Sequence, residues 1–132
     1  MKRRPEVGDR GEMRFVVATE HTIDFCDDRM PVVLSTPSLI WNLEYAAVNA
    51  LAPILESHEH CVGSQVDIQH LAPTSLGQQV VCVAKVINAD GPLVMFQVEA
   101  HDEHELIARG LHQRSVIDVE RFARRILKKM QA

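Results

Sequence analysis

The chain lacks a long apolar run. Its longest apolar stretches are interrupted by Glu44, Asp67 or Lys85 well before they reach the roughly 20 residues that span a bilayer. Residues 1–12 are charged and polar, so no basic segment followed by an apolar run opens the sequence. These absences argue against a membrane protein and a secretory signal peptide, and they predict a cytoplasmic location.

Cysteine is scarce and scattered along the chain. The three cysteines, Cys26, Cys61 and Cys82, are odd in number and include no C-x-x-C pair. A disulfide framework and a zinc site are therefore not expected, and neither a metal nor a cofactor is predicted.

An excess of positive charge is also absent. The formal net charge of -4 gives no basic surface for nucleic acid. The positive residues that are present gather near the C-terminal end. A solvated helix face would account for this cluster, and a local attraction for a polyphosphate-bearing ligand or an acidic partner is the alternative. The cluster consists of Arg121, Arg124, Arg125, Lys128 and Lys129.

What the chain does have is the length and composition of one globular domain. Its 132 residues are 46% apolar, which favours a single core over residues 1–132, with residues 1–12 as a flexible or loosely packed N-terminal segment. A strand, a long helix, a run of four strands and a terminal helix predict an α+β fold. The expected elements are a strand at 13–18, a connecting loop at 19–35, a helix from Thr36 to near Pro53, strands at 61–70, 79–88, 93–101 and 106–116, and an amphipathic helix at 119–130.

The long helix is expected to carry an acid on its apolar side. Thr36 can cap the free backbone amides, and Pro37 suits the first helical position. At about 100° per residue, Glu44 falls on the same side as Ile40 and Leu51. Small residues along this helix predict a close approach to another backbone, most naturally that of a sheet; they are Ala46, Ala47, Ala50 and Ala52.

The next strand is expected to carry a base. Strict alternation places His70 on one face with Val66 and Ile68, and Gly63 on the opposite face. A carboxylate and an imidazole that both face a dry interior are costly unless they meet each other or a substrate. Glu44 and His70 are therefore predicted to converge, in a natural place for acid–base or nucleophilic chemistry.

One helix wrapped by a curved antiparallel sheet is the hot-dog arrangement, and three segments carry a closer resemblance. Residues 32–55, 61–77 and 100–117 resemble the fluoroacetyl-CoA thioesterase-like branch of the hot-dog thioesterases. The marks are Thr36, a glutamate eight residues later at Glu44, and a histidine a further 26 residues on at His70, within an H-x-x-x-T motif. Gly63 and a late G-x-H-x-R pattern, formed by Gly110, His112 and Arg114, also match.

This resemblance implies hydrolysis of an acyl-CoA thioester by Thr36, Glu44 and His70, in a site at the interface of a homodimer that could pair further into a dimer of dimers. Glu44 would attack the carbonyl directly or activate a water, and His70 would orient the reaction and move the proton. The backbone amide of Gly63 is a candidate substrate-binding donor for the oxyanion, with a plain strand bulge as its alternative. The family's lid segment is longer than residues 24–34 here, so the acyl group stays open.

Plainer interpretations stand beside this one. Thr36 could be only a helix cap, Glu44 an edge residue that reaches water, and His70 a hydrogen-bonded structural residue. His112 and Arg114 are expected at the surface or in a dimer interface rather than in catalysis. A non-catalytic acyl-CoA-binding hot-dog module and a purely structural dimer are the other classes of function, and a hot-dog dehydratase is a weaker enzymatic alternative.

Overall fold

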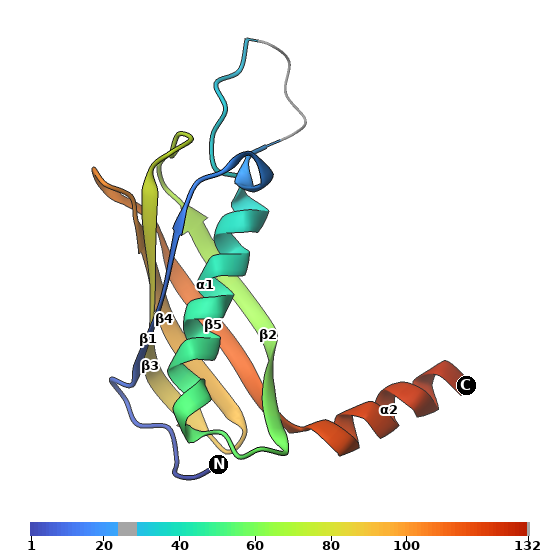
Figure 1. Cartoon of the computed structure of the whole chain (residues 1–132). Helices are drawn as coiled ribbons and strands as arrows, with labels where there is room; N and C mark the ends of the chain where they lie inside the picture. The colour runs from blue at the N-terminus through green and yellow to red at the C-terminus, as the bar shows by residue number, and fades with distance from the viewer. Residues whose placement is uncertain (24–28, 132) are drawn as a thin grey trace.

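The computed structural model describes residues 1–23 and 29–131, and it has the predicted α+β architecture (Figure 1). Cys26 and Phe25 lie outside the described residues. Every expected element is present. The strands expected from 61, 79 and 106 and the last helix run one or two residues beyond their expected bounds, whereas the first strand lies at 10–16 rather than 13–18 and the long helix ends at Leu51, before Pro53. In chain order they are β1 (Arg10–Val16), the short 3-10 helix η1 (Thr19–His21), α1 (Thr36–Leu51), the 3-10 helix η2 (Ala52–Ile54), β2 (Glu59–His70), β3 (Gln79–Asp90), β4 (Leu93–His101), β5 (Leu106–Asp118) and α2 (Val119–Gln131).

The strands form one antiparallel sheet that curves around α1 (Figure 1). Their order across the sheet is β1-β3-β4-β5-β2, so β1 and β2 are its two edges. The tight turn between β3 and β4 is made by Gly91, whose φ of 58° suits glycine. This central helix wrapped by a curved five-stranded sheet confirms the hot-dog prediction.

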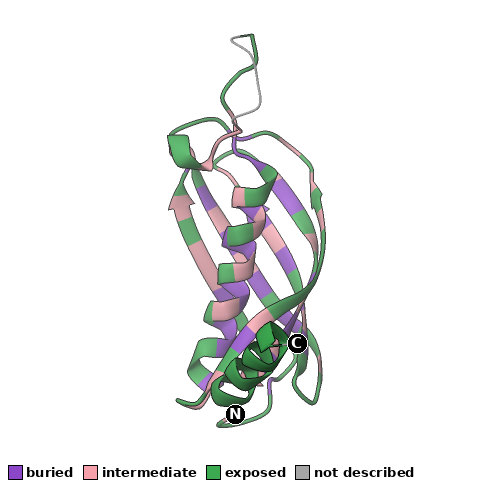
Figure 2. Ribbon diagram, turned by 90° about the vertical axis from the view of Figure 1, so that its right-hand side faces the viewer, coloured by how far each residue is buried: buried purple, intermediate pink, exposed green. Residues whose placement is uncertain are grey.

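Small residues bring α1 and the sheet into close contact, as the sequence predicts. Gly11 on β1 lies directly against α1, and a β-carbon built there would overlap the backbone of Ala46 and Ala50. The buried side of α1 then fills the core between helix and sheet (Figure 2). Its members are Leu39, Asn42, Leu43, Ala46, Ala47, Ala50 and Leu51.

The helix covers the sheet unevenly. α1 packs mainly on β1 and β3 and much less on β2. The side of α1 that faces toward β2 carries the half-buried residues Ile40, Glu44 and Val48. On β2 itself, Val66 pairs with the buried His112 yet is 42% exposed. The inner surface of the sheet is therefore open along its β2 edge.

The cap of α1 differs from the expected one. Ser35, not Thr36, is the N-cap residue, and its Oγ accepts a hydrogen bond from the backbone N–H of Ser38 at 3.3 Å. The Ser35 backbone is held in an extended conformation because its N–H donates to the carbonyl of His21 and the neighbouring Leu34 N–H donates to Thr74. Thr36 becomes the first helical residue, and its hydroxyl is free for another contact.

Strict alternation along β2 proved wrong at one point. The register with β5 shifts between Gly63 and Gln65, which marks a β-bulge. Gly63 pairs with Arg114 before the bulge and His70 pairs with Ala108 after it, and both partners are buried. Because directly paired residues point to the same face, the bulge turns Gly63 toward α1 rather than away from it.

The N-terminal residues are tied to the body at several points. The Met1 ammonium lies 2.8 Å from a carboxylate oxygen of Glu59, and the Lys2 N–H donates to the carbonyl of Ile54. Pro5 is buried. Among residues 1–23 and 29–131, no helix is both long and apolar enough to cross a membrane.

Candidate active site

The first cluster joins the start of α1 to the end of β2. Oγ1 of Thr36 lies 2.8 Å from Nδ1 of His70. The other ring nitrogen, Nε2, is buried and has no hydrogen-bond partner among the described residues. Burial lowers the pKa of His70, and the backbone of Ala72 raises it by a smaller amount. The imidazole is therefore neutral near pH 7, in the form that accepts a proton from a hydroxyl.

The second cluster is built around Arg114, on the inner face of β5. Its guanidinium donates to Oε2 of Glu44 at 3.2 Å and to the carbonyl oxygen of Cys61 at 3.1 Å. The Arg114 side chain is 7% exposed and that of Glu44 is 37% exposed, so the cation is buried while the carboxylate still reaches the open side of the sheet. Arg114 also donates to Sγ of Cys61 and faces Nε2 of His112, each at 3.2 Å.

His112 is fixed in one tautomer by its two neighbours. Its Nδ1 lies 2.8 Å from the carbonyl oxygen of Gln65, so Nδ1–H donates and Nε2 accepts from Arg114. Burial lowers the pKa of His112; the hydrogen bond to the Gln65 backbone opposes this shift, and the nearby Arg114 cation adds to it. The ring also stacks on Phe96, with centroids 6.4 Å apart. The surface position expected for His112 and Arg114 is therefore wrong, since both are buried beside Glu44, and the alternative of a dimer interface stays a prediction.

Gly63 faces this second cluster. A β-carbon built on Gly63 would lie 3.4 Å from Nη1 of Arg114, 3.4 Å from Cε1 of His112 and 3.6 Å from Oε2 of Glu44. These are ordinary contact distances, so packing within the chain does not require glycine here. The missing side chain instead leaves room directly in front of the Glu44 carboxylate.

The four predicted site residues fall into two groups within one chain. Thr36 contacts His70, and Glu44 lies with Gly63 and Arg114. Thr36 and Glu44 are eight residues apart on one helix, a rise of about 12 Å. Among the residues that the structure describes, no hydrogen bond or ion pair joins Glu44 to His70, so the predicted meeting of acid and base does not occur inside a single chain.

Arg114 and His112 are the site residues that the sequence interpretation undervalued. The signal was present in their spacing, because Ala108, Gly110, His112 and Arg114 alternate at the period of a strand whose inner face is buried. A paired Arg and His at such positions are expected to find polar partners inside. Within the described part of the chain, no group of three His, Cys, Asp or Glu residues is placed to hold a metal ion.

Comparison with known proteins places this geometry in a family. The model of the fluoroacetyl-CoA-specific thioesterase family, FlK, matches residues 17–120. The chain belongs to this family. The match confirms the resemblance and the expectation of a thioesterase enzyme.

Individual relatives of this family member agree with the assignment. The fluoroacetyl-CoA thioesterase of Streptantibioticus cattleyicolor is 31% identical over 100% of this chain and 99% of the relative. A solved FlK variant in complex with acetyl-CoA is 30% identical, with a TM-score of 0.86 over 94% of this chain and 98% of that one. A hypothetical protein of Thermus thermophilus, described as a thioesterase superfamily member, is 30% identical, with a TM-score of 0.85 over 99% and 98% of the two chains.

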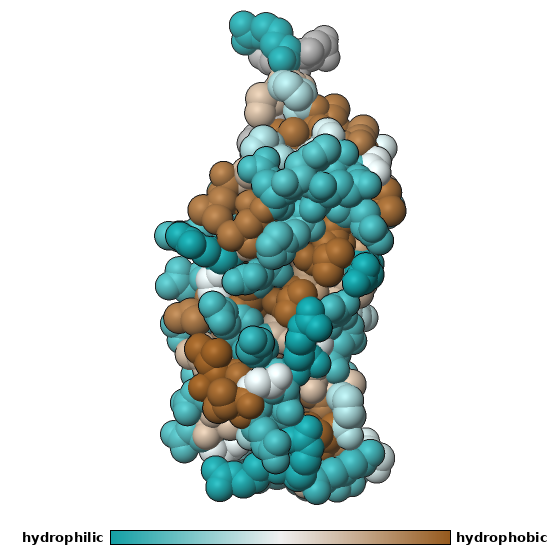
Figure 3. All heavy atoms as spheres, turned by 90° about the vertical axis from the view of Figure 1, so that its left-hand side faces the viewer, coloured by the Kyte–Doolittle hydropathy of each residue, from teal (hydrophilic) through white to brown (hydrophobic). Residues whose placement is uncertain are grey.

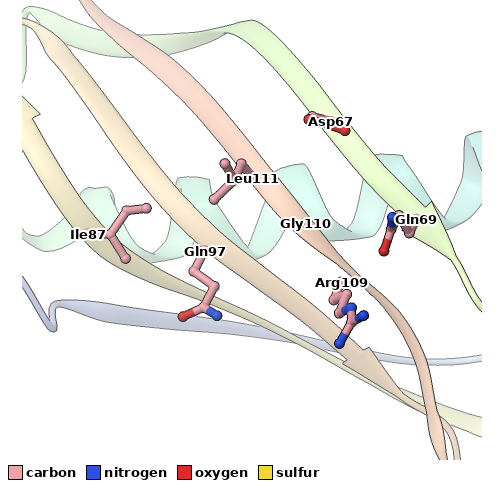
Figure 4. Close-up of a pocket in the computed structure, with 7 residues that line it drawn as sticks. All are labelled: Asp67, Gln69, Ile87, Gln97, Arg109, Gly110 and Leu111. Atoms are coloured by element: carbon pink, nitrogen blue, oxygen red, sulfur yellow. The ribbon is translucent and has the colours of Figure 1, made fainter.

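One surface hollow of this thioesterase-family chain lies away from both the Thr36–His70 cluster and the Glu44–Arg114 cluster. A hollow of about 490 Å³ is open on the outer face of the sheet, with α1 on the far side (Figure 4). None of Thr36, Glu44, Gly63 or His70 lines it, so it is separate from both clusters. Its lining consists of Asp67, Gln69, Ile87, Gln97, Arg109, Gly110 and Leu111.

Proposed function

We propose that this protein hydrolyses acyl-CoA thioesters, with Thr36, Glu44 and His70 as its catalytic residues. The observation that carries the proposal is the 2.8 Å contact between the Thr36 hydroxyl and His70, whose second ring nitrogen is buried and has no partner in the described chain. A buried polar atom without a partner is rare and costly, and it suits a position where a substrate or its proton arrives. The fluoroacetyl-CoA thioesterase relatives support the same chemistry.

His70 and Thr36 would handle protons and orientation at the helix start. A neutral imidazole beside a hydroxyl can take its proton as charge develops on the substrate. Thr36 is the first residue of α1, where free backbone amides and the helix dipole favour negative charge. Hydrolysis adds the oxygen of water to the carbonyl carbon and breaks the carbon–sulfur bond, so the products are the carboxylic acid and the free thiol of coenzyme A.

Glu44 would supply the oxygen chemistry. Arg114 fixes one carboxylate oxygen of Glu44 at 3.2 Å and leaves the other free, because no second contact to it exists among the described residues. That free oxygen can attack the thioester carbonyl or activate a water. Gly63 leaves space in front of Glu44, and its backbone amide is the proposed oxyanion donor. Arg114 is a positioning residue in this scheme, since it acts through Glu44.

A homodimer would complete the site. β2 is an edge strand whose outer backbone groups have no partner strand among residues 1–23 and 29–131, and the inner surface beside it is open. Unpaired edges favour pairing with another strand. A second copy against β2 would close the open side of the sheet. Both the Glu44 cluster and the Thr36–His70 pair lie next to this open side. A further pairing into a dimer of dimers is compatible with this arrangement.

The decisive experiment is a free-thiol release assay across acetyl-CoA, fluoroacetyl-CoA and branched, aromatic and long-chain acyl-CoAs. We expect Glu44→Gln and His70→Gln to remain folded and to lose at least about 100-fold in rate, the usual scale for an acid–base residue. The matched control is Asp67→Asn, on the outer face of the same strand, which should keep full activity. A Glu44→Gln or His70→Gln variant as fast as Asp67→Asn would remove that residue from the mechanism.

The same assay tests the non-catalytic alternative. Tight binding of an acyl-CoA with no release of thiol from any substrate would show a binding module rather than an enzyme. The proposed location is the cytoplasm, which suits the free thiols of the buried Cys61 and Cys82.

A further inference from the structure

Beyond its junction with β5, the C-terminal helix α2 makes few contacts with the described part of its own chain. It follows β5 directly, and its attachment includes a hydrogen bond from the Val119 N–H to the carbonyl of His58 at 2.9 Å. All residues from 119 to 131 are exposed, and the helix is drawn wholly in the exposed colour in Figure 2. Helices of about this length are marginal in water by themselves, so α2 needs a surface to pack against.

The two sides of α2 differ sharply in chemistry. One side is apolar, and Ile126, Leu127 and Met130 are 48%, 60% and 78% exposed. Val119 and Phe122 continue this apolar side toward the domain. The opposite side carries the basic residues Arg121, Arg124, Arg125, Lys128 and Lys129. On the face of the molecule turned away from α2, apolar residues are broken up by hydrophilic ones (Figure 3).

Charge favours a second copy of this chain as the surface that covers α2. Five basic residues and Glu120 give α2 a net charge of +4. Because the whole chain has a net charge of -4, the rest of the chain has a net charge of -8. A body this acidic attracts a basic helix from another copy. The same body is repelled by an anionic lipid surface, which makes a membrane the poorer partner for α2.

The position of α2 fits the same partner. α2 projects past β2, beyond the β2 edge of the sheet (Figure 1). A two-fold axis perpendicular to β2 pairs the two β2 strands in opposite directions, so the start of one lies beside the end of the other. α2 leaves the domain at the start of β2, next to His58. It would therefore reach the segment that follows β2 in the second copy.

That segment offers apolar side chains. Leu71 and Leu76 are 47% and 45% exposed, and they follow His70 at the end of β2. We infer that α2 is an arm that docks its apolar side on residues 71–76 of a second copy and forms a wall beside that copy's Thr36–His70 pair. A 13-residue helix is about 20 Å long, enough to lie across such a segment. The inference rests on the proposed homodimer and adds a second contact to it.

Cross-linking tests the contact directly. Two chains with distinguishable tags are co-expressed with Cys26 replaced by serine, one carrying Ile126→Cys and the other Leu71→Cys. Mild oxidation should give a disulfide-linked heterodimer, at least tenfold more than the control pair of Ile126→Cys with Val7→Cys. Val7 is 75% exposed and precedes β1, at the other edge of the sheet. Equal yields from the two pairs would overturn the arm.

A charge-matched pair of variants tests its contribution to assembly. Phe122→Asp with Ile126→Asp buries two charges in the proposed contact, and Arg124→Gln with Lys128→Gln removes the same net charge from the opposite side. Sedimentation should show the first variant at least tenfold weaker as a dimer, while the second should weaken only at low salt. Equal dimer affinities of the two variants would overturn the proposal. It would also be overturned if the wild-type protein bound phosphatidylserine vesicles, and if the first variant lost this binding while its dimer affinity stayed unchanged.

The outcomes separate the arm from the proposed function. A dimer that releases thiol at the wild-type rate, yet fails the cross-link, would refute the arm alone. A wild-type protein that sediments as a monomer at micromolar concentration would refute both the homodimer and the arm. Loss of thiol release in Glu44→Gln is measured independently of either result.

Discussion

The buried guanidinium of Arg114 gives the sharpest test of how the site is held together. Replacing Arg114 by Met removes all four of its hydrogen bonds while keeping an unbranched apolar stem. Two buried acceptors then lose their donor, namely the Cys61 carbonyl and Nε2 of His112. Leaving a buried polar group unsatisfied costs about 1–3 kcal/mol. Glu44 loses less, because its side chain is 37% exposed and regains water.

We therefore expect Arg114→Met to lower the free energy of unfolding by roughly 2–5 kcal/mol. The double variant Arg114→Met with Glu44→Gln should lose about 1 kcal/mol less stability than the sum of the two single losses, since a partly solvated pair couples weakly. Urea unfolding followed by circular dichroism measures both numbers, provided that the slope against urea is unchanged.

Arg109 provides the matched control on the same strand. It is exposed on the outer face of β5, so Arg109→Met should change the free energy of unfolding by no more than about 0.5 kcal/mol. Arg114→Lys keeps the charge but lacks the planar fork, and it should fall between the two. If Arg114→Met unfolds at the same urea concentration as Arg109→Met, then the network around Glu44 does not support the fold and the reasoning fails.

Three further predictions concern the helix start, the glycines and pH. Ser35→Ala removes the helix cap, so it should lower the free energy of unfolding by about 1 kcal/mol and keep its activity, whereas Thr36→Ala should stop thiol release. The opposite result, a destabilised but active Thr36→Ala and an inactive Ser35→Ala, would show that Thr36 is the cap. Gly11→Ala should cost about 1–3 kcal/mol in urea unfolding, because its β-carbon overlaps α1, while Gly63→Ala should unfold normally and lose activity. Burial lowers the pKa of both His70 and His112, so the unfolded chain binds these two protons more tightly than the folded chain. Stability should therefore fall as pH drops below 6.5, by up to about 1.4 kcal/mol per pH unit for each ring; a flat profile between pH 7 and 5 would contradict two neutral buried rings.

Local patterns in the sequence were sufficient for the elements and for part of the site. Hydrophobic periodicity and turn residues located both helices and all five strands, because each pattern is set by side chains close in sequence. The family resemblance placed Thr36 and His70 in one site, and the structure brings their side chains within 2.8 Å of each other. The fold class followed from the order of these elements.

The remaining features depend on contacts that no local pattern encodes. Ser35 and Thr36 can each cap a helix. Ser35 is the cap because backbone hydrogen bonds, from Leu34 to Thr74 and from Ser35 to His21, hold the chain extended up to Ser35. Glu44 was paired with His70 in the prediction because both are polar on apolar faces. The structure instead gives Glu44 a cation from β5, a strand 70 residues further along the chain at Arg114.

The extra residue in β2 has a consequence for how this strand can be altered. Gly63 and His70 are an odd number of positions apart, so a regular strand would send one of them to each side of the sheet. Because Ser64 is an extra residue in the strand, Gly63 and His70 both face α1. The number of residues between them is therefore as much a part of the chemistry as their identity, and deletion of Ser64 would turn one of the two out to solvent without changing any side chain of the proposed site.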